Sequence, residues 1–275
     1  SFAQATKLQP SEARYTLALA QAYKHSGELQ QAYATAASAH QLAPSMNAAL
    51  VLQAEIALQT SDTADAKRLA EDALRLAPTD SKALNVYAEC LHAIGEVDDA
   101  LAVLERSEQY AQDKLPIQLR RAQLLPAEKG LSEVLRLSKA NTERPDVYMT
   151  LSEMLAKTGD TEDAIQAAQR AAKKAETLPL PEQARLHLHL GKLLKRSGQL
   201  DQSLHHLDEA AALAPHLSEA HIERGQVFLS RRQFKQAMHA FELAAAAAPH
   251  SAQPHLEAAL ALKEVKDYNA AEAAL

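Results

Sequence analysis

The stretch APHLSEAHIERG at residues 214–225 recurs in outline 34 residues later, as APHSAQPHLEAA at residues 248–259. The same kind of proline returns at 34-residue intervals within two blocks of the chain: Pro10, Pro44 and Pro78, then Pro215 and Pro249. Self-similarity at a fixed period of this length indicates a stack of identical supersecondary units. The period therefore decides the architecture before any single helix is considered.

Each period contains the same internal signals. An amphipathic stretch such as 13–26 ends at Gly27, and a second stretch runs from Leu29 to Leu42 before the proline. Glycine supplies the positive φ that ends a helix within a few residues, and it falls at this turn at Gly27, Gly95, Gly159 and Gly198. Alanine occupies one equivalent place in the second stretch, where a small side chain lets two helices approach: Ala32, Ala66, Ala100, Ala164, Ala237 and Ala271. Each period thus predicts an antiparallel helix pair whose apolar faces are covered by its neighbours.

Composition agrees with an all-helical chain. Of 275 residues, 47% are apolar, only seven are glycine and none is tryptophan. The abundant alanine, leucine, glutamine and glutamate are helix formers. The single cysteine excludes an internal disulfide framework and any multi-cysteine zinc site. There is no apolar run of membrane-spanning length and no signal-peptide pattern. The cellular compartment is not decided by the sequence, with a slight preference for the cytoplasm over export of a parent protein.

The periodic residues resemble those of the tetratricopeptide repeat (TPR), whose pattern has Trp-x2-Leu-Gly-x2-Tyr, then Ala-x3-Phe, then Pro. The first clear match is His187-x2-Leu190-Gly191-x2-Leu194, with Leu207 and Pro215. The second is His221-x2-Arg224-Gly225-x2-Phe228, with Ala237, Phe241 and Pro249. An earlier repeat shows Leu19, Ala20, Tyr23, Ala32 and Pro44, and no unit carries the tryptophan. The resemblance implies an all-α fold, a right-handed α-solenoid of about eight stacked antiparallel helix pairs with a 34-residue period.

Domain organisation follows from the same register, with interruptions near Pro126 and at Pro179 and Pro181. We expect a single solenoid over residues 1–275, made of the end of a preceding repeat (1–12), three regular repeats (13–114), irregular middle repeats (115–183), and regular C-terminal repeats of which the last is truncated (184–275). Phe2 and Leu275 both fall inside a second helix, and neither end has the polar cap that solenoids use. The sequence therefore predicts a fragment of a longer array, or ends that associate with another copy.

Nothing in the sequence points to catalysis, a cofactor or a metal. No phosphate-binding glycine loop or nucleophile-elbow motif is present. Cys90 falls in an otherwise apolar column, which indicates a buried, inert thiol. Nine of the twelve histidines lie between residues 187 and 255, and His187, His221 and His255 share one column 34 residues apart. That separation is too large for a common zinc ion, so shared repeat ancestry is the better explanation, with acid softening of this end below about pH 6 as a weaker possibility.

The resemblance implies that the first helix of each pair lines a concave groove. One column there is almost all apolar and is either a groove floor or packing between adjacent helices: Leu17, Val51, Asn85, Leu119, Met149, Leu188, Ile222 and Leu256. The column one turn further on is mostly polar: Gln21, Glu55, Glu89, Gln123, Glu153, Lys192, Gln226 and Leu260. A cationic cluster lies on one first helix: Arg185, Lys192, Lys195 and Arg196. These columns without Gln123, Leu256 and Leu260, together with this cluster, are the predicted partner-binding residues.

The function predicted from these features is a non-catalytic scaffold that binds a peptide or protein partner in the groove. An accessory segment that recruits substrate or supports assembly in a larger enzyme or secretion machine is the alternative. An RNA-binding helical repeat ranks low, because the period is 34 residues and the net charge is −6. A chaperone-tail adaptor is disfavoured, because no three consecutive first helices restore the family's Lys and Asn clamp.

Overall fold

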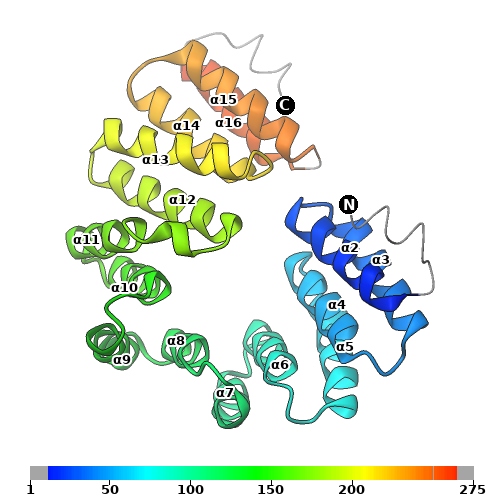
Figure 1. Cartoon of the computed structure of the whole chain (residues 1–275). Helices are drawn as coiled ribbons and strands as arrows, with labels where there is room; N and C mark the ends of the chain where they lie inside the picture. Colours follow the sequence, from blue (N-terminus) through cyan, green and yellow to red (C-terminus); the bar gives the residue numbers. More distant parts are fainter. Residues whose placement is uncertain (1–11, 250, 265–275) are drawn as a thin grey trace. The chain divides into compact units, whose positions relative to one another are not determined.

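The computed structural model describes residues 12–249 and 251–264. Within those residues the chain forms fifteen α-helices and one short 3₁₀ helix and has no strand. Figure 1 shows that consecutive helices pack side by side within each of the two compact units described below. The first helices of the pairs are α2 (Ala13–His25), α4 (Asn47–Gln59), α6 (Ser81–Ala93), α8 (Leu115–Leu124), α10 (Pro145–Thr158), α12 (Leu180–Arg196), α14 (Ser218–Ser230) and α16 (Gln253–Glu264). The second helices are α3 (Leu29–Leu42), α5 (Thr63–Leu76), α7 (Val97–Tyr110), α9 (Ala127–Ala140), α11 (Thr161–Ala172), α13 (Leu200–Leu213) and α15 (Phe234–Ala247).

The helices group into two compact units, one ending at Pro126 and the other beginning at Ala127. Unit 1 contains α2 to α8 and unit 2 contains α9 to α16. That the whole chain acts as one solenoid domain stays a prediction. The predicted partial repeats at the two ends, including Phe2 and Leu275, lie outside the described residues apart from Glu12 and the helix α16.

The turns inside the pairs have the backbone that the glycines predict. Gly27, Gly95, Gly159 and Gly198 take φ values of 84°, 89°, 96° and 79°. Three of the described pairs lack a glycine at this turn. In two of them Ser61 and Arg232 take the left-handed conformation, with φ values of 63° and 59°. In the third, between α8 and α9, Leu125 is extended before Pro126. The turn geometry is therefore a property of the repeat, and glycine is the residue that adopts it without a steric cost.

The prolines explain the irregular middle of the chain. Helix α8 has only 10 residues, because Pro126 follows it and the residue before a proline disfavours the helical conformation. Helix α12 has 17 residues, with Pro181 at its first turn, where a missing N–H costs nothing. The extra residues before it form the 3₁₀ helix Ala175–Thr177. The predicted insertion thus appears as an added turn at the start of a first helix.

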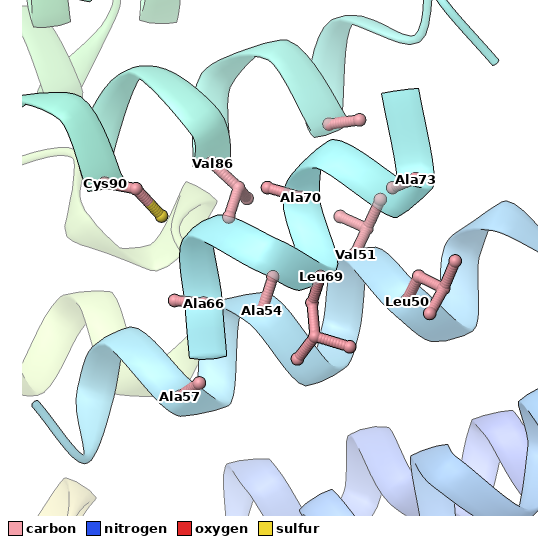
Figure 2. Close-up of a cluster of buried hydrophobic side chains, with 11 residues drawn as sticks. Leu50, Val51, Ala54, Ala57, Ala66, Leu69, Ala70, Ala73, Val86 and Cys90 are labelled. Atoms are coloured by element: carbon pink, nitrogen blue, oxygen red, sulfur yellow. The ribbon is translucent and has the colours of Figure 1, made fainter. Parts of the chain in front are cut away.

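Small side chains make up much of the core between the helices. Figure 2 shows one cluster, contributed by α4, α5 and α6, in which the side chains point toward one another between the ribbons: Leu50, Val51, Ala54, Ala57, Ala66, Leu69, Ala70, Ala73, Val86 and Cys90. Ala54 and Ala70 are fully buried on the facing helices of one pair. Such small residues let helix axes come close. Each alanine buries less apolar area than a larger side chain would, but each helix packs against several neighbouring helices, which adds buried area.

Unit 2 makes the same contact with a different pair of residues. At the positions of Ala54 and Ala70, one pair of unit 2 has Gly225 and Phe241, and another has Gly191 and Leu207. A Cβ atom on Gly225 would lie 2.4 Å from Cε1 of Phe241, and one on Gly191 would lie 2.7 Å from Cδ2 of Leu207. A large side chain on the second helix therefore fills the space that glycine leaves on the first.

Candidate interaction surface

The first helices of neighbouring pairs contact one another directly within each unit. Helix α2 contacts α4 and α4 contacts α6 in unit 1, and α12 contacts α14 and α14 contacts α16 in unit 2, more extensively than consecutive second helices do. A stack packed more closely along one side curves toward that side. We call the surface formed by the first helices the first-helix face, which is the inner side of each unit on this geometry.

The apolar column of the predicted groove is mostly buried. Val51, Leu119, Leu188 and Ile222 are 4–6% exposed, Leu17, Asn85 and Met149 are partly buried, and Leu256 on α16 is 49% exposed. Val51, Leu188 and Ile222 each belong to a core cluster that includes the second helix of their own pair and the first helix of the next pair. The observation supports the packing interpretation for most of these residues, and their role in partner binding stays a prediction.

The polar column of the predicted groove is connected from helix to helix by a regular set of bonds. Gln21 is exposed, whereas Glu55, Glu89, Gln123, Glu153, Lys192 and Gln226 are partly buried. Side chains in consecutive first helices pair when they are 31 residues apart, which is one period less one helical turn: Lys24 with Glu55, Glu89 with Arg120, Lys192 with Glu223, Lys195 with Gln226, and Gln226 with Glu257. We call these bonds the inter-repeat ladder.

The ladder neutralises half of the predicted basic cluster. Lys195 forms an ion pair with Glu223 and donates to Oε1 of Gln226 at 2.5 Å, and Lys192 lies 2.6 Å from Glu219. Arg185 and Arg196 are exposed and form no ion pair within the described part of the chain. The acidic residues that flank His221 in sequence thus hold the lysines of α12, and the two arginines are left for solvent.

The histidines of unit 2 do not make contacts along the 34-residue column that contains His187, His221 and His255. His187 on α12 contacts His206 on α13, with their Nδ1 atoms 3.0 Å apart, and His221 instead contacts the carbonyl of Pro215 at 3.2 Å. Burial lowers the pKa of all three, and that of His206 falls to about 4. Sequence reasoning compared equivalent columns of first helices and so missed His206, which lies across the pair on the second helix.

His189 is held between two first helices. Its Nε2 lies 2.9 Å from Oγ of the buried Ser152 on α10, which also donates to the carbonyl of Ala164 at 2.7 Å. Burial, together with the charges of Lys192 and Arg196, lowers the pKa of His189 to about 4. The imidazole is therefore neutral at pH 7 and joins α10 to α12.

The cavities lined by described residues lie against second helices. One of about 260 Å³ is lined by Arg224 and Phe228 on α14 and by Lys235, Gln236, His239 and Ala240 on α15. Another of about 450 Å³ occupies the equivalent place in unit 1, between α6 and α7, where Tyr87 and Leu91 stand for Arg224 and Phe228. Both are shallow surface grooves at equivalent positions of the repeat. The charge and polarity of each groove therefore depend on which residues occupy these positions in that repeat.

The described residues bear on the sequence predictions for the thiol, for a metal site of three or more ligands and for a membrane span. Cys90 is fully buried, and burial raises the pKa of its thiol to about 11, as expected for an inert residue. Among residues 12–249 and 251–264, no group of three or more histidine, cysteine or acidic side chains converges in a way that could hold a metal ion. In the same residues, no helix combines the length and the apolar character that crossing a bilayer requires.

The missed feature of this surface is the 31-residue spacing. Columns of residues at 34-residue intervals do not reveal this spacing. Bonds between consecutive first helices instead join positions one turn apart in the repeat. Opposite charges or complementary amides at 31-residue separation, such as Lys24 and Glu55, are the signal that would have found the ladder.

Comparison with known proteins agrees with the repeat geometry. The family model described as the ARM repeat of tetratricopeptide repeat protein 21 matches residues 84–241, and one described as tetratricopeptide repeat matches residues 51–114. No curated protein sequence matches the chain.

Two solved structures show the same fold. The crystal structure of yeast Tom70 superposes with a TM-score of 0.73 at 17% identity, covering 99% of this chain and 57% of that one. The crystal structure of the APC/C hetero-tetramer Cut9–Hcn1 superposes with a TM-score of 0.63 at 15% identity, covering 95% and 51%. The chain thus spans about half the length of these structures. With the match over 84–241 covering more than half of the chain, and with the helix pairs and turn glycines described above, the chain belongs to the tetratricopeptide-repeat family.

Proposed function

We propose that this chain is a non-catalytic scaffold that binds a peptide segment of a partner protein on its first-helix face. Tetratricopeptide repeats are typically protein-interaction scaffolds and are generally non-catalytic. The observation that carries the finer proposal is the surface of α12, where Arg185 and Arg196 are exposed and lack ion-pair partners among the described residues.

These two arginines lie on one side of α12. They are 11 residues apart, which is close to three full turns, so their side chains project in the same direction. Lys192 lies between them on that side and is 41% exposed while it pairs with Glu219. A row of three cations about 16 Å long suits an extended segment with acidic residues, because Arg binds carboxylates through two parallel hydrogen bonds.

The buried apolar column sets a limit on this recognition. Since Val51, Leu188 and Ile222 are at most 6% exposed, they offer little area to a ligand. Recognition on this face therefore depends on polar contacts, and the affinity falls with ionic strength. Charge of this kind contributes more to orientation and association rate than to tight binding.

The test is a peptide array that varies acidic and apolar content, probed with the full chain. We expect acidic peptides to be retained by the wild type and lost by the double variant Arg185→Glu and Arg196→Glu. The matched control, Lys139→Glu with Lys235→Glu, makes the same change of charge at exposed positions on α9 and α15. Equal loss in both double variants would indicate bulk electrostatics and would refute a site on α12.

An assembly role is the second candidate. One structure with the same fold is of a hetero-tetramer, Cut9–Hcn1, and the chain spans about half of the length of that protein chain. In that role the same face, or the surface of a terminal helix such as α16 with Leu256 and Leu260 nearly half exposed, contacts another subunit. Size measurement of the full chain by sedimentation over a hundredfold concentration range distinguishes self-assembly from peptide binding.

A further inference from the structure

The contact between His187 and His206 joins two metal-ligating atoms from different helices. Their Nδ1 atoms are 3.0 Å apart, and the ring centroids are 5.2 Å apart with the planes inclined at 34°. With both rings neutral, one Nδ1 carries a hydrogen and donates it to the lone pair of the other. Each ring also has an Nε2 that can take the hydrogen instead, so both Nδ1 lone pairs can be freed without a change of charge.

The distance suits two neighbouring ligands of one metal ion. Bonds from imidazole nitrogen to a transition metal are about 2.0–2.1 Å long, and two such bonds to nitrogens 3.0 Å apart enclose about 90–95°. That angle is the one between adjacent ligands in the square-planar or tetragonal geometry of Cu²⁺ and Ni²⁺. It is smaller than the tetrahedral angle that zinc prefers.

The surroundings favour a cation at this point. Glu209 follows His206 by three residues on α13, so the two side chains lie on the same side of the helix, and its negative charge raises the pKa of both imidazoles. Burial has the larger, opposite effect and keeps both rings neutral at pH 7, which is the form that binds metals. Both side chains are only partly buried, so an ion can reach them from solvent.

We propose that His187 and His206 form a two-histidine site for a divalent transition-metal ion of the Ni²⁺ and Cu²⁺ class. Water completes the coordination, since no third protein ligand converges there among the described residues. With two protein ligands the ion exchanges with solvent, unlike a structural zinc closed by four. Binding joins α12 to α13, because each helix supplies one ligand, and it therefore stabilises the folded state by mass action.

Titration calorimetry of the full chain with NiCl₂ at pH 7.5 tests the site. We expect one Ni²⁺ per chain, at least tenfold weaker binding in both His187→Ala and His206→Ala, and a change below twofold in His205→Ala. His205 is the matched control, because it lies next to His206 on α13, is exposed, and places its ring 5.2 Å away. Equal loss in His205→Ala, or no binding by the wild type at millimolar Ni²⁺, overturns the proposal.

A measurement on the wild type keeps the test independent of the stability of the variants. Electron paramagnetic resonance of the chain loaded with one equivalent of Cu²⁺ should show coupling to two imidazole nitrogens. Coupling to a single nitrogen overturns the proposal, because it places the ion on one exposed histidine.

Discussion

The α4–α5 pair of unit 1 and the α14–α15 pair of unit 2 make the same contact between first and second helices with opposite choices of residue size. In unit 1 the contact joins Ala54 to Ala70, two small side chains that are fully buried. In unit 2 the equivalent positions hold Gly225 and Phe241, and the ring occupies the space that a Cβ on the glycine would need. The large ring on the second helix is matched by the missing side chain on the first, so the residue sizes at this contact depend on each other.

This difference in residue size affects how much stability a single substitution removes. A contact made of small residues has little to lose from any one substitution, whereas a single large ring concentrates the buried area of a pair in one residue. The histidines add a second difference, because three lie in unit 1 and nine in unit 2. Core truncation should therefore cost more in the α14–α15 pair than in the α4–α5 pair, and unit 2 should be the more sensitive to acid.

The largest effect is expected for Phe241→Ala. The side chain is 1% exposed, and truncating a buried phenylalanine costs about 3–5 kcal/mol through lost burial and the cavity left behind. Hydrogen exchange resolved by peptide should show faster exchange in α14 and α15. Ala70→Gly in unit 1 is the comparison, with an expected loss of about 1 kcal/mol from helix propensity. Equal losses of unfolding free energy in the two variants would contradict the idea that the ring of Phe241 supplies most of the stability of its helix pair.

Acid should destabilise unit 2 before unit 1. The pKa of His189 is about 4 in the folded chain, against about 6.5 for an unperturbed histidine. The contribution of the neutral ring is fully present above about pH 6.5 and is lost as the pH falls toward 4, with about 2–3 kcal/mol lost in total. Peptide-resolved hydrogen exchange at pH 7 and at pH 5, after correction for the intrinsic exchange rate and with a chelator present, should show selective loss of protection in α10 and α12.

The control for the acid effect is His189→Gln, which keeps a hydrogen-bonding group near Ser152 and does not titrate. This variant should lose less protection between pH 7 and pH 5 than the wild type does. In unit 1 the clearly shifted pKa values lie outside that window, as for Tyr33, which burial and its bond to Asp65 raise to about 12. Parallel loss of protection in both units would show that the histidines of α12 are not the cause.

A smaller loss is expected for Gly225→Ala, because the added methyl group meets the ring of Phe241 at 2.4–2.8 Å. Overpacking of this kind costs about 2 kcal/mol. Combining it with Phe241→Ala recreates the residues of Ala54 and Ala70, so the two changes should be strongly non-additive in chemical denaturation. Simple addition of the two losses would mean that residue sizes at this contact are not coupled.

The smallest effect is expected in the inter-repeat ladder. Lys195→Met removes the ladder bond to Gln226 and the closer of the two lysines that pair with Glu223, whose side chain is 12% exposed, and should cost about 1 kcal/mol. Arg68→Met is the matched change in unit 1, where the side chain is 58% exposed and pairs only within its own helix. There the loss should be below about 0.5 kcal/mol, and thermal unfolding of both variants against the wild type measures the difference.

The helix pairs could be predicted from the sequence because their signals are local. Gly27 and Gly198 mark turns that do have positive φ, and Pro126 follows a helix that does end early. The partners of His187 and Lys195 could not be predicted in the same way. Their contacts depend on the offset between helices, which the 34-residue alignment hides and the packed structure supplies.

The constant offset of the ladder has a genetic consequence. Deleting the 34 residues 47–80 brings Glu89 to the place of Glu55, so Lys24 again has a glutamate 31 residues ahead. The same deletion puts Ala88 where Ala54 was, and both are buried alanines. Loss or duplication of a whole repeat therefore leaves each junction with a compatible neighbour, and an array of this kind can change length during evolution while its junctions remain intact.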